Sequence, residues 1–259
     1  NKPLKIVTTI FPEYDWVREI LGDKADHAEV TMLLDNGVDL HSYQPTADDI
    51  IKISDCDLFI HVGGESDGWV EDALKEAANK DMQVINLLDV RLTFGDGLLK
   101  AEVLETEEEE SGDEDELEYD EHVWLSLKNA ETLCNAITDA LEEIDPANKD
   151  AYAANAASYL EKLAALDGEY QTVVDNDGAA RKTVLFGDRF PFRYLVDDYG
   201  LSYYAAFAGC SAETEASFET ISFLAGKVDE LGLPCVLTIE GAQHKIAETI
   251  VQNSAAKNQ

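Results

Sequence analysis

The feature that most constrains the fold is a regular alternation of short apolar runs and longer amphipathic stretches. The first half of the chain contains four apolar runs, and segments with helical spacing of apolar residues separate them. The runs are Leu4–Ile10, Glu29–Leu34, Asp57–Val62 and Gln83–Leu88. Strands that alternate with helices of this length are typical of βαβ units, which form mainly parallel sheets. We therefore predict an α/β fold for this half of the chain.

A second constraint is the spacing of aromatic and aliphatic residues after Pro146. They recur at three- and four-residue steps up to Val173, which predicts one helix of about 28 residues and about 42 Å. A helix of this length exceeds what one small lobe needs, so we expect it to link two lobes. A second set of predicted strands follows it, at Thr183–Phe186, Leu201–Ala206 and Cys235–Ile239.

These patterns predict an α/β fold of two Rossmann-like lobes joined by a long rigid helix. We place an N-terminal α/β lobe at residues 1–125, and it includes an acidic loop at 102–121. A helical segment that contains the linking helix occupies 126–178, and a C-terminal α/β lobe occupies 179–259. The last pattern in the chain is a helix with no strand after it, so we expect the C-terminal lobe to lack its final strand.

The acidic loop dominates the charge of the chain. The sequence has 54 Asp and Glu against 19 Lys and Arg, a formal net charge of −35, and 13 acidic residues lie between Glu102 and Glu121. Like charge this dense cannot bury enough apolar surface to fold alone, which predicts a solvated loop. The charge argues against nucleic acid and anionic membrane surfaces as partners, because both would be repelled. The loop is either a collector of divalent cations or an insertion without function.

Two histidines stand out by their position. His41 lies in a turn after the second predicted strand, and His122 lies where the acidic loop meets a helix. Ligands of open α/β sheets bind at the carboxyl ends of strands, so both are candidate metal ligands. The alternative for each is a surface or hydrogen-bonded histidine. The glycine-rich loop at 63–68 also follows a strand, and it is either a tight connection or a cleft-lining loop that offers Glu65.

Neither the cysteines nor any catalytic motif indicates a particular function. The four cysteines are widely spaced with no CxxC, which disfavours a zinc finger. Cys56, Cys134 and Cys235 lie in apolar patterns and are predicted to be buried thiols, whereas Cys210 lies in a polar loop and is predicted to be accessible. The sequence contains no GxSxG, Walker, GxGxxG or HExxH motif, so we expect that it is not an enzyme.

Several segments resemble the zinc/manganese substrate-binding proteins of ABC importers, in the same order and through nearly the whole chain. The HxYxP element that begins at His41 and the HVWL element that begins at His122 are the most specific. The segments are Ile6–Pro12, His41–Thr46, Asp57–Gly64, Glu121–Ser126, Tyr199–Leu201 and Val236–Glu240. The resemblance implies two α/β lobes, a rigid linking helix and a metal site in the inter-lobe cleft. It also places an acidic or histidine-rich loop before the second histidine, where residues 102–121 lie.

The resemblance also implies a set of metal ligands. His41 matches the first metal histidine of the family and His122 matches the second. The third ligand, a histidine or glutamate in the family, falls at Arg189, or at Asp188 after a one-residue shift. A guanidinium cannot bind a cation, so Asp188 is the candidate for this position. Glu65 is a further candidate ligand because of its place in the glycine-rich loop, independently of the resemblance. The fourth ligand of the family lies beyond the last residue of this chain. Two imidazoles with carboxylates suit Zn²⁺, with Mn²⁺ as the alternative.

The function implied by the resemblance is capture of a divalent metal, most simply zinc, and its delivery to an ABC permease. We expect the protein on the extracellular side of the cytoplasmic membrane or in the periplasm. It would be tied to the membrane only by an N-terminal lipid anchor that this chain does not include. Two alternative functions belong to other classes of protein. One is a zinc-dependent hydrolase with His41 and His122 as ligands and Glu65 as base, and the other is a cell-surface adhesion module with a structural metal.

Overall fold

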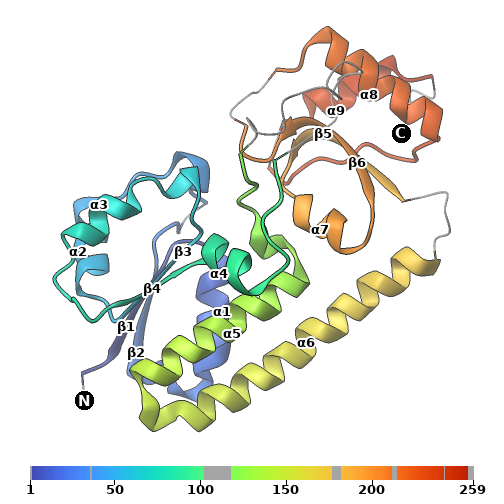
Figure 1. Ribbon diagram of the computed structural model, residues 1–259. Coiled ribbons are helices and arrows are strands. Elements are labelled where there is room, and N and C mark those ends of the chain that lie inside the picture. Colours follow the sequence, from blue (N-terminus) through green and yellow to red (C-terminus); the bar gives the residue numbers. More distant parts are fainter. Residues whose placement is uncertain are drawn as a thin grey trace. The chain divides into compact units, whose positions relative to one another are not determined.

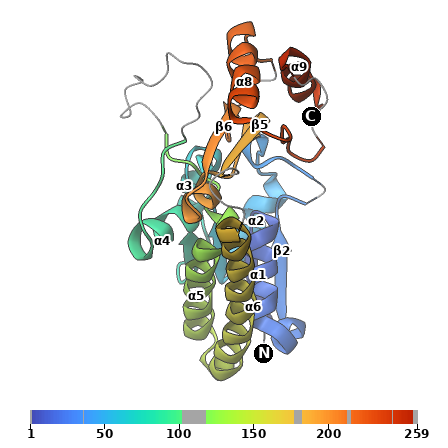
Figure 2. The same cartoon turned by 90° about the vertical axis from the view of Figure 1, so that its right-hand side faces the viewer.

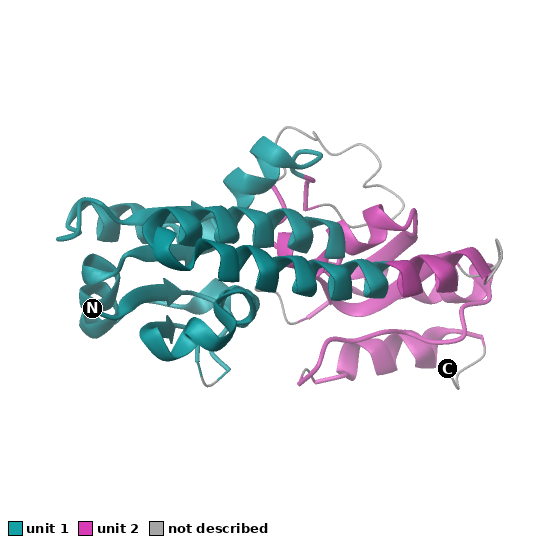
Figure 3. Ribbon diagram, turned by 90° about the horizontal axis from the view of Figure 1, so that it is seen from below, with its two compact units in different colours: residues 1–98, 127–167 teal, residues 99–126, 168–259 magenta. Residues whose placement is uncertain are grey.

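The computed structural model describes residues 2–35, 37–101, 118–176, 182–211, 215–241 and 243–255 (Figure 1). The chain forms two compact units (Figure 3). Unit 1 comprises Asn1–Leu98 and Leu127–Asp167, and unit 2 comprises Leu99–Ser126 and Gly168–Gln259. The domain boundaries at 125/126 and 178/179 remain a prediction. The greater part of the predicted acidic loop, residues 102–117, lies outside the described residues.

Unit 1 is built on a four-stranded parallel sheet with the order β2-β1-β3-β4. Its strands are β1 (Leu4–Thr8), β2 (Ala28–Met32), β3 (Leu58–His61) and β4 (Gln83–Asn86). All four residues of β3 are buried, as expected for an inner strand of a parallel sheet that is covered on both faces. The predicted parallel α/β arrangement is therefore confirmed for this part of the chain.

Helices cover the sheet of unit 1. They are α1 (Phe11–Leu21), α2 (Ala47–Asp55), α3 (Val70–Lys75), α4 (Leu87–Phe94), α5 (Leu127–Ile144) and the first part of α6 (Lys149–Asn176). Figure 2 shows α1, α5 and this part of α6 side by side, and the Asn155 amide donates a hydrogen bond to the Ile20 carbonyl at 3.0 Å. Helix α4 was not predicted, because the strand was expected to continue to Leu88. The Asn86 side chain instead accepts a hydrogen bond from Asp89 N and starts a helix.

The long helix predicted from the sequence is confirmed. Helix α6 has 28 residues, and the division between the two units falls within it, after Asp167. Its buried residues are Tyr152, Ala156 and Leu163. Few residues of α6 are buried, which agrees with a helix that belongs partly to each unit rather than one that packs wholly in a single core.

Unit 2 is built on a parallel pair, β5 (Thr183–Phe190) and β6 (Ser202–Ala208), connected by α7 (Arg193–Asp198). Successive residues of β5 face opposite sides of this pair. Leu185 packs in a cluster with residues of α8 (Phe218–Leu231) and α9 (Lys245–Asn253). Phe186 packs in a second cluster with Val196 of α7. The sheet of unit 2 is thus covered by helices on both faces.

The predicted strand Cys235–Ile239 is wrong for most of its length. The structure records a single parallel bridge, between Phe186 and Leu237. Beyond it, Ile239 N donates to the Asp188 carboxylate at 3.1 Å, so a side chain replaces the next backbone partner. Cys235 is exposed, and its predicted burial is also wrong, because the segment before the bridge lies outside the sheet. Cys56 and Cys134 are buried as predicted, and Cys210 is half-buried.

None of the helices in the described ranges is both long enough and apolar enough to cross a membrane.

Candidate metal site

His41 lies in unit 1, in the short 3₁₀ turn η2 (Leu40–Ser42). The Asp39 carboxylate begins this turn by accepting a hydrogen bond from His41 N at 2.9 Å. The imidazole is half-buried, and its Nδ1 lies 2.8 Å from Ser66 Oγ. A histidine held through Nδ1 is oriented to offer Nε2, which is how metal-binding histidines are commonly fixed.

Glu65 begins the 3₁₀ turn η3 (Glu65–Asp67), which also carries Ser66. The turn is anchored by Asp67, a buried residue whose carboxylate accepts a hydrogen bond from Gly63 N at 2.7 Å. The same carboxylate lies 3.1 Å from Nδ1 of His61, which is buried in β3. Glu65 itself is exposed. The structure therefore places Glu65 beside the residue that orients His41, and its role as a ligand remains a prediction.

Two short segments of unit 2 pair at the base of the acidic loop. Lys100 and Tyr119 form an antiparallel bridge. Ala101 N donates to the Glu118 carbonyl at 2.8 Å, and Asp120 N donates to the Leu99 carbonyl at 2.8 Å. The described residues on either side of segment 102–117 are thus paired, and the segment that begins at Glu118 runs directly into His122.

Helix α7 fixes the segment that contains His122. Tyr194 OH donates a hydrogen bond to the Asp120 carbonyl at 2.8 Å. On the other side of the histidine, Ser126 Oγ donates to the Asp198 carboxylate at 2.6 Å. Between these two attachments lies the 3₁₀ turn η6 (Val123–Leu125). The backbone on both sides of His122 is therefore attached to the same helix.

His122 forms a buried carboxylate–histidine pair with Asp120. The two residues are only 5% and 1% exposed. Asp120 Oδ1 accepts a hydrogen bond from His122 N at 2.8 Å and lies 2.9 Å from Nδ1. Because an ionised carboxylate can only accept, this contact places the imidazole proton on Nδ1. Carboxylate–histidine pairs of this kind fix the tautomer and raise the basicity of the nitrogen that binds a metal.

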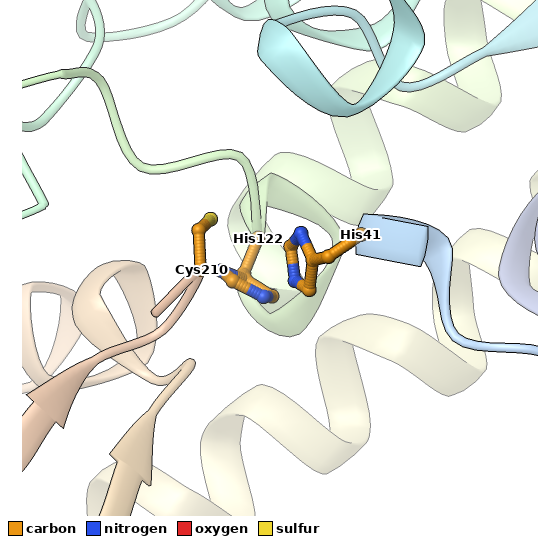
Figure 4. A group of neighbouring side chains, drawn as sticks. All are labelled: His41, His122 and Cys210. Atoms are coloured by element: carbon orange, nitrogen blue, oxygen red, sulfur yellow. The ribbon is translucent and has the colours of Figure 1, made fainter. Parts of the chain in front are cut away.

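Cys210 lies beside His122 in unit 2, in the turn after β6 (Figure 4). A ring nitrogen of His122 and Cys210 Sγ lie within 4.8 Å of each other. A Cβ built on Gly209 would stand 2.7 Å from Cε1 of His122, so the glycine permits this close approach. The third residue labelled in Figure 4, His41, belongs to unit 1.

The surroundings of Cys210 are negative. Its Sγ lies 3.9 Å from the Glu121 carboxylate. Burial, followed by the charges of Glu121 and Asp120, raises the pKa of the Cys210 thiol to about 12. The thiol is thus protonated at neutral pH unless a cation is bound next to it. The sequence predicts only that Cys210 is accessible, because a cysteine so far along the chain from His122 gives no motif that would connect the two residues.

Asp188 has a structural role in unit 2. It lies in β5 where the register with β6 shifts between Phe186 and Arg189. Its Oδ1 accepts a hydrogen bond from Arg189 N at 2.8 Å, and its Oδ2 accepts one from Ile239 N at 3.1 Å. Both carboxylate oxygens are thus used by backbone amides. The expectation that Asp188 is a metal ligand remains a prediction.

Known proteins similar to this chain bind zinc according to their names. The zinc-binding lipoprotein AdcA of Streptococcus pneumoniae serotype 4 is 32% identical over 260 residues, covering 98% of this chain and 48% of that protein. The high-affinity zinc uptake system protein ZnuA of Bacillus subtilis is 31% identical over 268 residues, covering 99% of this chain and 77% of that protein. The chain spans about half the length of the AdcA relatives that it matches.

A solved structure with the same fold is the Zn(II)-bound ZnuA-like domain of Streptococcus pneumoniae AdcA. Its TM-score is 0.72 at 29% identity, and the match covers 98% of this chain and 85% of that one. The family described as "ZnuA: Zinc-uptake complex component A periplasmic" matches residues 6–258. The chain therefore belongs to the ZnuA family of zinc-uptake components.

Proposed function

We propose that this protein captures Zn²⁺ outside the cytoplasm and delivers it to the permease of an ABC importer. The observation that carries the proposal is the buried Asp120–His122 pair of unit 2. Such a pair is typical of zinc sites, where a carboxylate orients the histidine ligand. The names of the relatives, a zinc-binding lipoprotein and a zinc uptake protein, support the same cargo.

His41 and His122 are the two imidazole ligands of this proposal. Each is held through Nδ1, by Ser66 in unit 1 and by Asp120 in unit 2. Imidazole ligands favour Zn²⁺, whereas Mn²⁺ prefers sites with more oxygen ligands. Glu65 and Asp188 are the carboxylate candidates that the sequence contributes. The acidic loop is proposed to raise the local concentration of cations beside His122.

The proposed role is transport and not catalysis. A carrier needs ligands that bind a cation and later release it, and it needs no base to activate water. The periplasmic description of the family and the lipoprotein name of one relative support a location outside the cytoplasm. A lipid anchor and a permease partner are parts of the proposal that the ZnuA family suggests.

The test is the zinc affinity of the purified protein, measured by competition with a chelating dye. The wild-type protein should bind one Zn²⁺ tightly, and the double variant His41→Ala/His122→Ala should lose this binding. The matched control is His27→Ala, because His27 is an exposed histidine of the 3₁₀ turn η1 (Gly22–His27) in unit 1. Unchanged affinity in the double variant would overturn the site assignment, and a wild-type protein without tight binding would overturn the function.

A further inference from the structure

We infer that Cys210 supplies a thiolate ligand to the bound zinc, at the place in the site where Asp188 was expected. The inference rests on the proposed function and specifies the donor set of the same site. It makes the unit 2 part of the site a histidine–cysteine pair. A thiolate donor selects Zn²⁺ and other softer cations over Mn²⁺, so this ligand also decides between the two metals considered above.

The separation between Cys210 and His122 fits one shared ion. Zinc binds histidine nitrogen at about 2.0–2.1 Å and cysteine sulfur at about 2.3 Å, so the two donors of a tetrahedral site lie about 3.6 Å apart. One ring nitrogen of His122 and the sulfur of Cys210 lie within 4.8 Å of each other. The inference requires the two atoms to approach this shorter separation when the ion binds. As the Zn–S bond forms, the S–H bond breaks and its proton passes to the solvent.

The surroundings keep the two donors together. The imidazole of His122 is held by Asp120, and the absence of a side chain at Gly209 allows the turn that carries Cys210 to lie against this ring. The half-buried position of Cys210 leaves the thiol within reach of an ion that approaches from the solvent. These contacts involve only residues of unit 2.

Asp188 is less suited to the same role. Its two oxygens accept hydrogen bonds from the backbone amides of Arg189 and Ile239. Turning this carboxylate toward a metal would leave a partly buried N–H group without its partner, which is unfavourable. Cys210 has no comparable structural task among the contacts described above, because its weak contact with Glu121 spans 3.9 Å.

The experiment replaces Zn²⁺ by Co²⁺, which gives a near-ultraviolet charge-transfer band when a thiolate is bound. We expect this band in the wild-type protein and in Asp188→Asn. It should also persist in Cys235→Ser, the matched control with an exposed cysteine of the same unit. Cys210→Ser should lose the band, and its zinc affinity should fall by at least about tenfold. An unchanged circular dichroism spectrum would show that Cys210→Ser is folded.

A second measurement keeps the inference testable if Cys210→Ser does not fold. In the Cys235→Ser protein, the remaining cysteines besides Cys210 are the buried Cys56 and Cys134. Zn²⁺ should then protect the accessible thiol from alkylation, and excess chelator should restore the reaction. Equal alkylation with and without Zn²⁺ would overturn the inference.

The outcomes separate this inference from the proposed function. If the wild-type protein binds Zn²⁺ tightly and shows no thiolate band with Co²⁺, the function stands and the Cys210 ligand is wrong. Persistence of the band in Cys210→Ser would also overturn the assignment. Loss of zinc affinity in Asp188→Asn alone would make Asp188 the ligand. If no tight zinc binding is found in the wild-type protein, the proposed function itself fails.

Discussion

The two candidate histidines differ in how firmly the structure holds them. His41 is half-buried, lies on a three-residue 3₁₀ turn and is oriented by the neutral hydroxyl of Ser66. His122 is 5% exposed and is oriented by Asp120, a carboxylate that is itself 1% exposed. The segment around His122 is attached on both sides to α7, by hydrogen bonds with Tyr194 and Asp198 of that helix.

This difference indicates how the binding free energy is divided between the two units. A charged acceptor strengthens a hydrogen bond about twofold relative to a neutral one, and it raises the basicity of the metal-binding nitrogen. Side chains that are already fixed also lose less conformational entropy when a ligand binds. The unit 2 part of the site should therefore contribute more to zinc affinity than the unit 1 part.

The largest expected effect on zinc affinity comes from removing the histidines one at a time. His122→Ala should weaken zinc binding more than His41→Ala, because it removes the better oriented ligand and leaves the buried Asp120 carboxylate without its imidazole contact. Competition with a chelating dye measures both affinities under the same conditions. A larger loss in His41→Ala would reverse the comparison between the two units.

Substituting the residues that orient the histidines should have the next largest effect on zinc affinity. Asp120→Asn should lower zinc affinity about 10–100-fold, the usual range for a residue that supports a metal ligand. Ser66→Ala removes a neutral hydrogen bond worth about 1 kcal/mol, so its effect should be about fivefold. Isothermal calorimetry with a competing chelator compares the two variants. Equal losses would show that the buried carboxylate adds nothing beyond a hydroxyl.

A third prediction concerns the close approach between Gly209 and His122. Gly209→Ala would place a methyl group 2.7 Å from the His122 ring and force the ring or the turn to move. Overpacking of this kind costs about 1–3 kcal/mol, and we expect a drop of about tenfold in zinc affinity. The control is Gly226→Ala in α8, where an added Cβ meets nothing within 4 Å. If both variants bind zinc equally well, the contact does not position His122.

The smallest effect on tight binding should come from shortening the acidic loop. Deleting residues 105–116 keeps Glu118, whose carbonyl accepts a hydrogen bond from Ala101 N at the base of the loop. The tight site should survive, while the rate of zinc loading at low ionic strength should fall because local attraction of cations is reduced. Stopped-flow fluorescence measures that rate. Complete loss of the tight site would make the loop part of the site itself.

Local patterns predicted the fold well wherever neighbouring residues determine the element. Helix α6 has the predicted length of about 28 residues because the apolar spacing that predicts it lies within the helix itself. The strand predicted at Cys235–Ile239 failed because a distant carboxylate, Asp188, bonds Ile239 N in place of a strand. A hydrogen bond over that sequence separation leaves no periodic signal.

The candidate site was predictable only in part for the same reason. His41 and His122 lie in short motifs that a resemblance can find. Cys210 comes next to His122 only through the pairing of β5 and β6 and the close approach at Gly209. The signal in the sequence is the pair Gly209-Cys210, which lies shortly after the predicted strand Leu201–Ala206 and directly after β6. This pair points to a ligand only once the end of β6 is known to lie beside His122.

The most direct test of zinc binding at His122 is a crystal structure of the zinc-loaded protein with anomalous diffraction measured on both sides of the zinc absorption edge. The expected result is an anomalous peak about 2.0–2.1 Å from Nε2 of His122, with Nδ1 still bonded to Asp120. A zinc peak found only among the carboxylates of the acidic loop, with His122 unliganded, would contradict this account.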